Sequence, residues 1–310
     1  MTRKTSEHTR REALQCLAAG SAGTLYLLSG GVLTPVSLAH AAGVDMKAAK
    51  PLFVQISDTH IGFKGGANPD VPGTVSRTID LVNALSQKPE LVIHTGDITH
   101  LSKAAEFDVA EQLLSHLPVT ELHSVPGEHD VIDGPGKEYF ARFGAASNNR
   151  GYYSFDHSGV HFVALVNVMN FKPNGLGALG DEQLEWLEQD LKARTSSTPI
   201  VVFAHMPLWS VYEPWGWGTG DADRAMTYLR RFGSVAVLNG HIHQIVTKVE
   251  GNITFHTARS SAYPQPTPGD GPGPGPLTVP VEKLPALLGL TSVTVKVGSP
   301  ALSLADIPLT

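Results

Sequence analysis

The chain has a single cysteine, Cys16, among its 310 residues. One cysteine excludes an internal disulfide framework and any zinc site built from several cysteines. The chain also lacks a block of basic residues, and its formal net charge is −6. Proteins that bind duplex nucleic acid by neutralising phosphates carry a basic patch, so we expect no such partner. Histidine is abundant, with fourteen residues, so a metal site here would use histidine and carboxylate ligands.

Charged residues are absent from a long segment near the N-terminus. No Asp, Glu, Lys or Arg occurs from Ala13 to Val44. The pair Arg10-Arg11 precedes this apolar segment, and Ala39-His40-Ala41 lies near its end. This order is typical of a cleaved export signal of the twin-arginine type. We therefore expect residues 1–41 to be a signal peptide and the protein to be periplasmic or secreted.

An uncleaved membrane anchor is the alternative, because the apolar segment is long enough to span a bilayer. However, several glycines and Pro35 interrupt it, and the small-residue cleavage site follows it directly. We favour cleavage, and so expect no stable membrane anchor in the processed protein.

The rest of the chain alternates apolar runs with amphipathic segments. The apolar runs predict strands over residues 52–56, 91–94, 119–125, 200–203 and 235–238. Helical spacing predicts helices over 74–86, 102–116, 180–193 and 221–232, with Ser102 as the N-cap of the second. Hairpins are expected within 152–166 and 245–257. Strand–helix units followed by hairpins predict an α/β fold of stacked sheets with helices outside.

A segment rich in proline and glycine follows. Residues 264–276 contain six Pro and four Gly, which excludes a helix and predicts a long surface loop. Residues 291–297 are mostly β-branched and are expected to form a closing strand. We therefore predict one main domain over residues 50–262, with 263–310 forming a loop and a closing strand of the same domain.

Metal-ligating residue types follow the predicted strands in five places. These are Asp58-Thr59-His60, Gly96-Asp97, Gly127-Glu128-His129-Asp130, His205 and Gly240-His241-Ile242-His243. In an extended segment residues i and i+2 point the same way, so each Xaa-x-His pair can face one site. Each motif alone is explained by a turn or a buried histidine. The five together, each at a strand end where open α/β sheets place ligands, predict a common metal site.

The number of donors predicts how many metals this site holds. Seven oxygen and nitrogen donors exceed the needs of one tetrahedral zinc. They suit two metal ions about 3.5–4 Å apart that share one carboxylate. Mixed carboxylate and imidazole donors favour iron, manganese or zinc over magnesium or calcium. A hydroxide held between two such ions can attack phosphorus.

The order of the motifs resembles the calcineurin-like metallophosphoesterase superfamily over about residues 52–257. The resemblance implies two mixed β-sheets packed as a sandwich and flanked by helices. It also implies which metal each residue binds. Asp58, His60 and His243 would hold the first metal, Glu128, His205 and His241 the second, and Asp97 would bridge the two. By the same resemblance, His129 binds the phosphate and protonates the leaving oxygen, while Asp130 orients His129 through its other ring nitrogen.

Glu128 departs from the family pattern, which has asparagine at this position. Glutamate can ligate through oxygen, but it adds a negative charge and lacks an amide N–H group that could contact a phosphate oxygen. With two divalent ions and one hydroxide, the third carboxylate leaves the centre with no net formal charge. This weakens the attraction for a phosphate anion and favours a trivalent ion in one position.

The resemblance is strongest to bacterial cyclic-nucleotide or general phosphodiesterases. We therefore expect an exported enzyme with two metal ions that cleaves small phosphate diesters or monoesters by attack of a metal-bridging hydroxide. Thr99 and His100 are candidates for lining its cleft. Residues 209–217 contain three Trp and one Tyr, which either stack on a substrate group or pack beneath a loop.

Two alternatives remain open at this point. One is hydrolysis of a pyrophosphate bond in a nucleotide-linked lipid. The other is a non-catalytic metal-binding or partner-binding protein whose site is altered by Glu128. The intact His129-Asp130 pair argues against the second alternative, because a pure binding site needs no acid for a leaving group.

Overall fold

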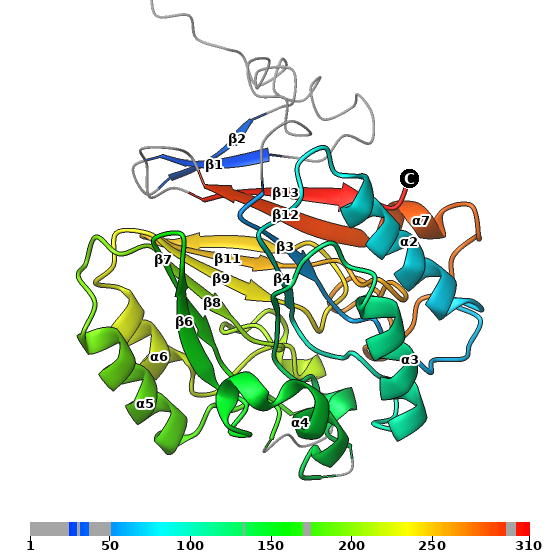
Figure 1. Cartoon of the computed structure of the whole chain (residues 1–310), viewed down its shortest axis with the longest axis horizontal. Coiled ribbons are helices and arrows are strands. Elements are labelled where there is room, and N and C mark those ends of the chain that lie inside the picture. The colour runs from blue at the N-terminus through cyan, green and yellow to red at the C-terminus, as the bar shows by residue number, and fades with distance from the viewer. Residues whose placement is uncertain (1–24, 30–31, 37–50, 133, 170–174, 296–301) are drawn as a thin grey trace, which may run out of the picture.

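The protein consists of two β-sheets packed face to face, with helices on both outer faces (Figure 1). This computed structural model describes residues 25–29, 32–36, 51–132, 134–169, 175–295 and 302–310. The first sheet has the order β2-β1-β13-β12-β3-β4-β5, and the second has the order β10-β11-β9-β8-β7-β6. Both are mixed sheets, which confirms the predicted sandwich.

Each sheet contains a block of parallel strands, at one edge of the first sheet and in the middle of the second. The first sheet contains β1 (Leu25–Ser29), β2 (Val32–Val36), β3 (Phe53–Ile56), β4 (Leu91–His94), β5 (Leu122–Ser124), β12 (Gly289–Val295) and β13 (Leu302–Pro308). The second contains β6 (Tyr153–His157), β7 (Val160–Ala164), β8 (Ile200–Phe203), β9 (Val235–Asn239), β10 (Thr247–Glu250) and β11 (Ile253–Thr257). Strands β3, β4 and β5 run parallel, as do β7, β8, β9 and β11. Their carboxyl ends therefore gather at one end of the sandwich.

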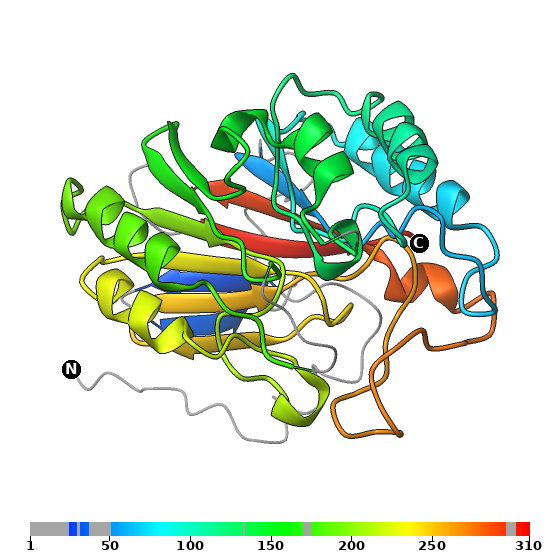
Figure 2. The same ribbon diagram turned by 90° about the horizontal axis from the view of Figure 1, so that it is seen from below.

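Helices cover the outer faces of the two sheets. Helices α2 (Val71–Ala84) and α3 (Ala104–Leu114) pack on the first sheet, and α5 (Asp181–Lys192) and α6 (Ala222–Leu229) pack on the second (Figures 1 and 2). Two shorter helices are α4 (Lys137–Phe143) and α7 (Leu284–Leu287). The 3₁₀ turns are η1 (Glu128–Asp130), η2 (Ala145–Ser147) and η3 (Glu213–Trp215).

Alternation along the buried strands explains why the core has three layers. In β3, Val54 and Ile56 face the helices, whereas Phe53 faces the second sheet. In β8, Val202 packs under α5 and α6, whereas Phe203 lies between the sheets. Strands that are buried on both faces carry continuous apolar runs. This is the pattern from which the sequence predicted them.

Several element boundaries differ from the sequence predictions. Helix α2 begins at Val71, before the predicted position 74, because Asp70 caps it by accepting a hydrogen bond from the Gly73 N–H at 3.0 Å. Ser102 is not the N-cap of α3, so that prediction is wrong; the helix begins one residue after Lys103. Ser102 instead donates to the carbonyl oxygen of His129 at 2.7 Å. Strand β5 is shorter than predicted, and α4 and β13 were not predicted.

The predicted signal peptide falls mostly outside the described residues. Of residues 1–41, only β1 and β2 are described, and β1 pairs with β13 in antiparallel register, Tyr26 opposite Leu304. Processing after Ala41 therefore stays a prediction. Across the described parts of the chain, none of the helices has the length and apolar character needed to cross a membrane.

Candidate metal centre

All seven predicted ligands lie together at the carboxyl ends of the parallel strands. Each comes from the segment directly after a strand: Asp58 and His60 after β3, Asp97 after β4, Glu128 after β5, His205 after β8, and His241 and His243 after β9. Two sheets thus contribute to one centre. Strands far apart in sequence deliver these side chains to a single point because the parallel strands of both sheets end there.

The first ligand cluster consists of Asp58, His60 and His243. All three side chains are buried, and each offers one ligand atom within 4.8 Å of the others. The His243 Nε2 atom lies 3.3 Å from Asp58 Oδ1 and 3.2 Å from His60 Nε2. Two ring nitrogens and one carboxylate oxygen thus converge on a common point, as the ligands of a metal ion do.

The second cluster consists of Glu128, His205 and His241. Glu128 places one oxygen 2.8 Å from His205 Nε2 and the other 2.9 Å from His241 Nδ1. Glu128 Oε2, His205 Nε2 and His241 Nδ1 are all buried without a hydrogen-bond partner. Buried polar atoms that stay unpaired are costly, and a bound cation would satisfy all three at once. The donor set therefore fits a metal ion.

Asp97 lies between the two clusters. Its Oδ2 atom is 3.5 Å from His60 Nε2 and 3.3 Å from His205 Nε2. The other oxygen, Oδ1, accepts a hydrogen bond from the His129 N–H at 2.9 Å. One carboxylate oxygen thus faces both clusters, which is the position that the sequence assigned to a bridging ligand.

Backbone carbonyls fix the ring orientation of two ligands. His205 Nδ1 lies 2.7 Å from the carbonyl oxygen of Thr95, and His243 Nδ1 lies 2.6 Å from that of Tyr263. A carbonyl can only accept, so each Nδ1 carries a hydrogen and Nε2 is the ring nitrogen that faces the centre. Burial alone would lower the pKa of His205, but Asp97 and Glu128 outweigh it and raise that pKa well above the ordinary value, so a metal ion bound there would displace a proton from Nε2. Both rings are held in the orientation that can bind a metal.

The backbone around the ligands is held in a left-handed conformation that residues other than glycine rarely adopt. Five of the seven ligands have positive φ: Asp58 (51°), His60 (39°), Asp97 (54°), His241 (68°) and His243 (53°). Such residues cost free energy and concentrate at functional sites. The glycines in the motifs leave room for close approach. A Cβ atom at Gly127 would collide with Asp97 Oδ1, and one at Gly240 would lie 2.5 Å from Asp58 Oδ2.

Electrostatics keep the ligand carboxylates anionic. Burial alone would raise the pKa of Glu128, but His241 and His205 outweigh it and hold that pKa well below its ordinary value. Burial alone would also raise the pKa of Asp58, but the neighbouring His243 outweighs it and holds that pKa below its ordinary value. Burial and the neighbouring His129 lower the pKa of His60, which favours its neutral form. Anionic carboxylates beside a neutral imidazole are the protonation states that metal binding requires.

His129 lies beside the centre, but its ring is not oriented as expected. The ring nitrogen Nδ1 lies 2.7 Å from the carbonyl oxygen of His100, and the two rings stack with centroids 4.8 Å apart. His129 also lines the cavity above the clusters. Burial lowers its pKa, but Asp97 and Glu128 outweigh burial and raise it above the ordinary value. A raised pKa suits a group that donates a proton.

Asp130 does not contact the His129 ring, so its expected orienting role is wrong. Its carboxylate accepts hydrogen bonds from the backbone N–H groups of Ile98, Thr99 and Gly127 and from the Thr99 hydroxyl. Burial and the nearby Asp97 raise the pKa of Asp130 to about 7. Asp130 therefore ties the loop of the bridging Asp97 to the loop of Glu128, and the His100 carbonyl orients His129.

A cavity of about 310 Å³ opens over both clusters. Aromatic side chains form much of its wall: Phe63, Trp215, Trp217 and Tyr263, together with His100. The stretch 274–276 of the Pro/Gly segment lines it too. Gln265 holds this segment in place, because its Nε2 donates to the His241 carbonyl oxygen at 2.8 Å and its Oε1 accepts from the Gly275 N–H at 3.1 Å. The predicted surface loop thus borders the centre, and we call this space the aromatic cavity.

Two residues that support the centre were not identified from the sequence. Tyr263 stacks on His60 with ring centroids 4.8 Å apart, and its carbonyl orients His243. Ser57 donates to Asp58 Oδ2 at 2.5 Å and accepts from the Thr95 hydroxyl at 2.7 Å. Ser57 directly precedes the motif Asp58-Thr59-His60, and this position in the sequence could have identified it as a supporting residue. Tyr263 orients His243 through its backbone carbonyl, which no residue pattern reveals.

Comparisons with known proteins agree with this geometry. Residues 51–245 match the model of a family described as calcineurin-like phosphoesterase. A protein of Arcobacter nitrofigilis named "Probable glycerophosphodiester phosphodiesterase GpdQ" is 27% identical over 225 residues, which cover 68% of this chain and 79% of that protein. A Mus musculus protein named serine/threonine-protein phosphatase CPPED1 is 26% identical over 216 residues, which cover 62% of this chain and 69% of that protein.

A solved structure shows the same fold. It is that of a dimetal phosphatase from Danio rerio, with a TM-score of 0.64 and 14% sequence identity. The superposition covers 84% of this chain and 98% of that one. The predicted architecture of two mixed sheets with flanking helices is confirmed.

Proposed function

This chain belongs to the calcineurin-like phosphoesterase family, and we propose that it is a phosphodiesterase with two metal ions, cleaving small phosphate diesters in preference to monoesters. The observation that carries the proposal is the pair of three-ligand clusters with one oxygen of Asp97 facing both. When bound there, two metal ions would supply Lewis acidity and a hydroxide nucleophile at neutral pH. The donor chemistry favours iron, manganese or zinc.

The protein's own residues support binding and departure of the ester groups. His129 borders the cavity over the clusters, and the His100 carbonyl holds its Nδ1 hydrogen. The other ring nitrogen, Nε2, is then the atom that can contact a phosphate oxygen and transfer a proton to a leaving alkoxide. The aromatic cavity offers flat apolar surfaces to an ester group beside this ring.

The charge of the centre supports diesters over monoesters. Three carboxylates, those of Asp58, Asp97 and Glu128, lie among the seven ligands. No lysine or arginine is among the described residues that line the aromatic cavity. A monoester dianion carries one more negative charge than a diester monoanion, and the described residues that line this cavity include no lysine or arginine to offset it. The same lack of cations disfavours a pyrophosphate substrate, whose second phosphate would need a partner.

Relative rates with two aryl substrates test the proposal. Protein loaded with manganese, iron or zinc is assayed with bis(4-nitrophenyl) phosphate and with 4-nitrophenyl phosphate. We expect kcat/KM to be at least about tenfold higher for the diester, which corresponds to about 1.4 kcal/mol. A preference for the monoester would favour a phosphatase, as the name of the mouse relative suggests. His205→Ala should abolish both activities, whereas His116→Ala, at an exposed histidine just after the C-terminal end of α3, should not.

A further inference from the structure

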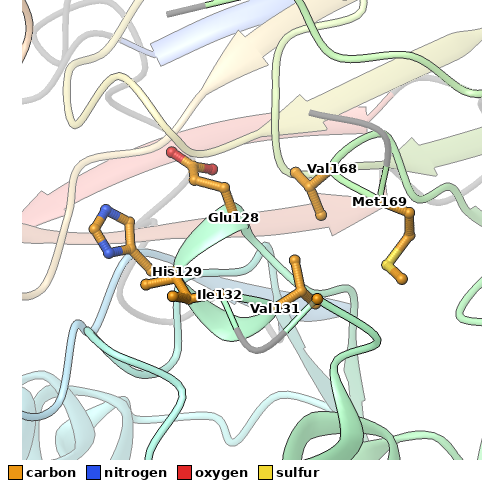
Figure 3. Close-up of a pocket in the computed structure, with 7 residues that line it drawn as sticks. Glu128, His129, Val131, Ile132, Val168 and Met169 are labelled. Atoms are coloured by element: carbon orange, nitrogen blue, oxygen red, sulfur yellow. The ribbon is translucent and has the colours of Figure 1, made fainter. Parts of the chain in front are cut away.

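A second cavity adjoins the metal centre on the other side of the Glu128–His129 pair. Its volume is about 450 Å³, within the range of about 300–1,000 Å³ that is typical of ligand cavities. Figure 3 shows the ring of His129 at one side of this space and the side chains of Val131, Val168 and Met169 at the other. Ile132 completes the wall. We call this space the aliphatic cavity.

The two cavities share a wall at the catalytic end. Glu128 and His129 line both the aliphatic cavity and the aromatic cavity. A phosphate group placed at the two ligand clusters would therefore have one cavity on each side of His129. A phosphomonoester carries a single organic group and would fill one of them. A phosphodiester carries two organic groups, and this arrangement offers a separate place for each.

The walls of the aliphatic cavity determine which organic group fits. Apart from Glu128 and His129, the described residues that line it have no polar side chain. Ile132 is 55% exposed and Met169 is 39% exposed, so two large apolar side chains face solvent beside the centre. Apolar surface gathered around a cavity is typical of a binding site for an apolar group. The flexible thioether of Met169 can adapt to chains of different shape.

The aromatic cavity is the better binding site for an aromatic group. Rings capable of stacking, such as those of Phe63, Trp215 and Tyr263, line the aromatic cavity. Among the described residues that line the aliphatic cavity, only His129 has a ring. A hydrocarbon chain gains free energy from contact with aliphatic walls in proportion to the apolar area removed from water.

We propose that the aliphatic cavity binds an alkyl chain on the non-leaving side of a phosphodiester, so that the substrate class is an alkyl phosphodiester. The inference rests on the proposed phosphodiesterase function. It adds a second subsite, built from Val131, Ile132, Val168 and Met169, to the metal centre. The leaving group occupies the aromatic cavity, and the alkyl group of the ester points past Glu128 into the aliphatic one.

A series of substrates with one leaving group tests this subsite. Methyl, butyl and octyl 4-nitrophenyl phosphate differ only in the alkyl chain. We expect kcat/KM to rise by about two- to fourfold for each added methylene until the cavity is filled. The aryl group and the phosphate charge are the same in all three substrates, so a rise in kcat/KM measures the contribution of the alkyl chain alone.

Two polar variants locate the effect. Ile132→Asn and Met169→Gln should flatten the rise with chain length, so that kcat/KM for the octyl ester falls by a larger factor than kcat/KM for the methyl ester. Matched controls are Val281→Asn and Leu287→Gln, which change exposed apolar residues away from the centre. Both controls should keep the rise of the unsubstituted protein. The Ser102 hydroxyl accepts the backbone N–H of Ile132, so this contact survives the side-chain change.

The outcomes separate the subsite from the proposed function. Equal kcat/KM for the methyl and octyl esters, or a rise that survives in both polar variants, would overturn the subsite while leaving a phosphodiesterase. If no diester is hydrolysed with any metal, the proposed function fails. The subsite is then tested by measuring the affinity for diesters with long and short alkyl chains. Calorimetric titration of the metal-loaded protein with methyl octyl phosphate and with dimethyl phosphate then gives the answer. Tighter binding of the octyl compound that is lost in Ile132→Asn supports the subsite, and equal binding overturns it.

Discussion

The His129 ring packs edge-to-face on that of His60, with ring centroids 4.8 Å apart, and its Nδ1 lies 2.7 Å from the His100 carbonyl oxygen, so we expect His129 to border the two ligand clusters without holding a metal. His129→Ala should therefore keep both metals. For substrates with poor leaving groups we expect a loss of about 10²–10⁴-fold in rate, because the proton donor is gone. Nitrophenolate leaves without protonation, so 4-nitrophenyl esters should lose less. Rates across a series of leaving groups, with metal content measured on each sample, check this; an equal loss throughout would contradict the assignment.

Glu128 sets the charge of the second cluster. Its two oxygens reach His205 and His241 separately, at 2.8 and 2.9 Å. Glu128→Gln keeps the length of the side chain but removes one negative charge and adds an amide donor. One additional charge-assisted hydrogen bond is worth about 1.5–3 kcal/mol, so the inhibition constant of inorganic phosphate should fall by a factor of about ten or more in the variant. Unchanged inhibition in a variant that retains its metals would mean that the third carboxylate does not control anion binding.

At the scale of single residues, the sequence predicted which seven side chains gather at the centre but not which groups support them. The seven ligands lie in short motifs at strand ends, so residue type and position together identified them. The orientation of His129 depends on a carbonyl at His100, and that of His243 on a carbonyl at Tyr263. Every residue has a carbonyl, so its use depends on the fold and leaves no mark in residue types.

An ion pair joins elements of the two sheets. His256 Nε2 of β11 lies 3.0 Å from Asp306 Oδ1 of β13, and the Thr291 hydroxyl of β12 donates to the same oxygen at 2.7 Å. Burial alone would raise the pKa of Asp306, but His256 outweighs it and lowers that pKa below the ordinary value. The pair therefore stabilises the packing of one sheet on the other while Asp306 is ionised.

Removing this carboxylate should cost stability in a pH-dependent way. Asp306→Asn should lower the free energy of unfolding by about 1.5–3 kcal/mol near pH 7. A lowered folded-state pKa stabilises fully above the unfolded pKa of about 3.9, and the contribution disappears as the pH falls through the folded pKa. The difference between the two proteins should therefore shrink below about pH 4. Denaturant titrations at pH 7 and pH 3.5 measure it, with the exposed Asp270→Asn as control; a difference independent of pH would contradict the role of the charge.

At the scale of elements, apolar runs predicted the buried strands well and the edges less well. Strands β3, β4, β8 and β9 are buried along their whole length, so apolar residues dominate them, with Gln55 inside β3 and polar residues only at the last positions of β4 and β9. Strand β13 was missed because Ser303 and Asp306 interrupt its pattern and Pro308 ends it. Helix α4 has seven residues, which gives too little periodicity to separate a helix from a loop.

For the molecule as a whole, we propose export through a twin-arginine signal and processing after Ala41. The pair Arg10-Arg11 and the site Ala39-His40-Ala41 motivate this proposal. Replacing both arginines with lysine should leave an unprocessed precursor in the cytoplasm, as cell fractionation and N-terminal sequencing would show. Normal export of the variant, or an exported protein that retains Cys16, would contradict it. Processing at this point would also remove β1 and leave β13 at the edge of its sheet.

The central claim is that one centre holds two metal ions and that hydrolysis needs both. Its most direct test is a titration of metal-free protein with manganese, in which bound metal per chain and kcat/KM for bis(4-nitrophenyl) phosphate are measured on the same samples. The two ligand clusters and the shared oxygen of Asp97 predict saturation at two ions per chain, with most activity appearing as the second ion binds. Full activity with one ion per chain, or no binding of a second, would contradict the account.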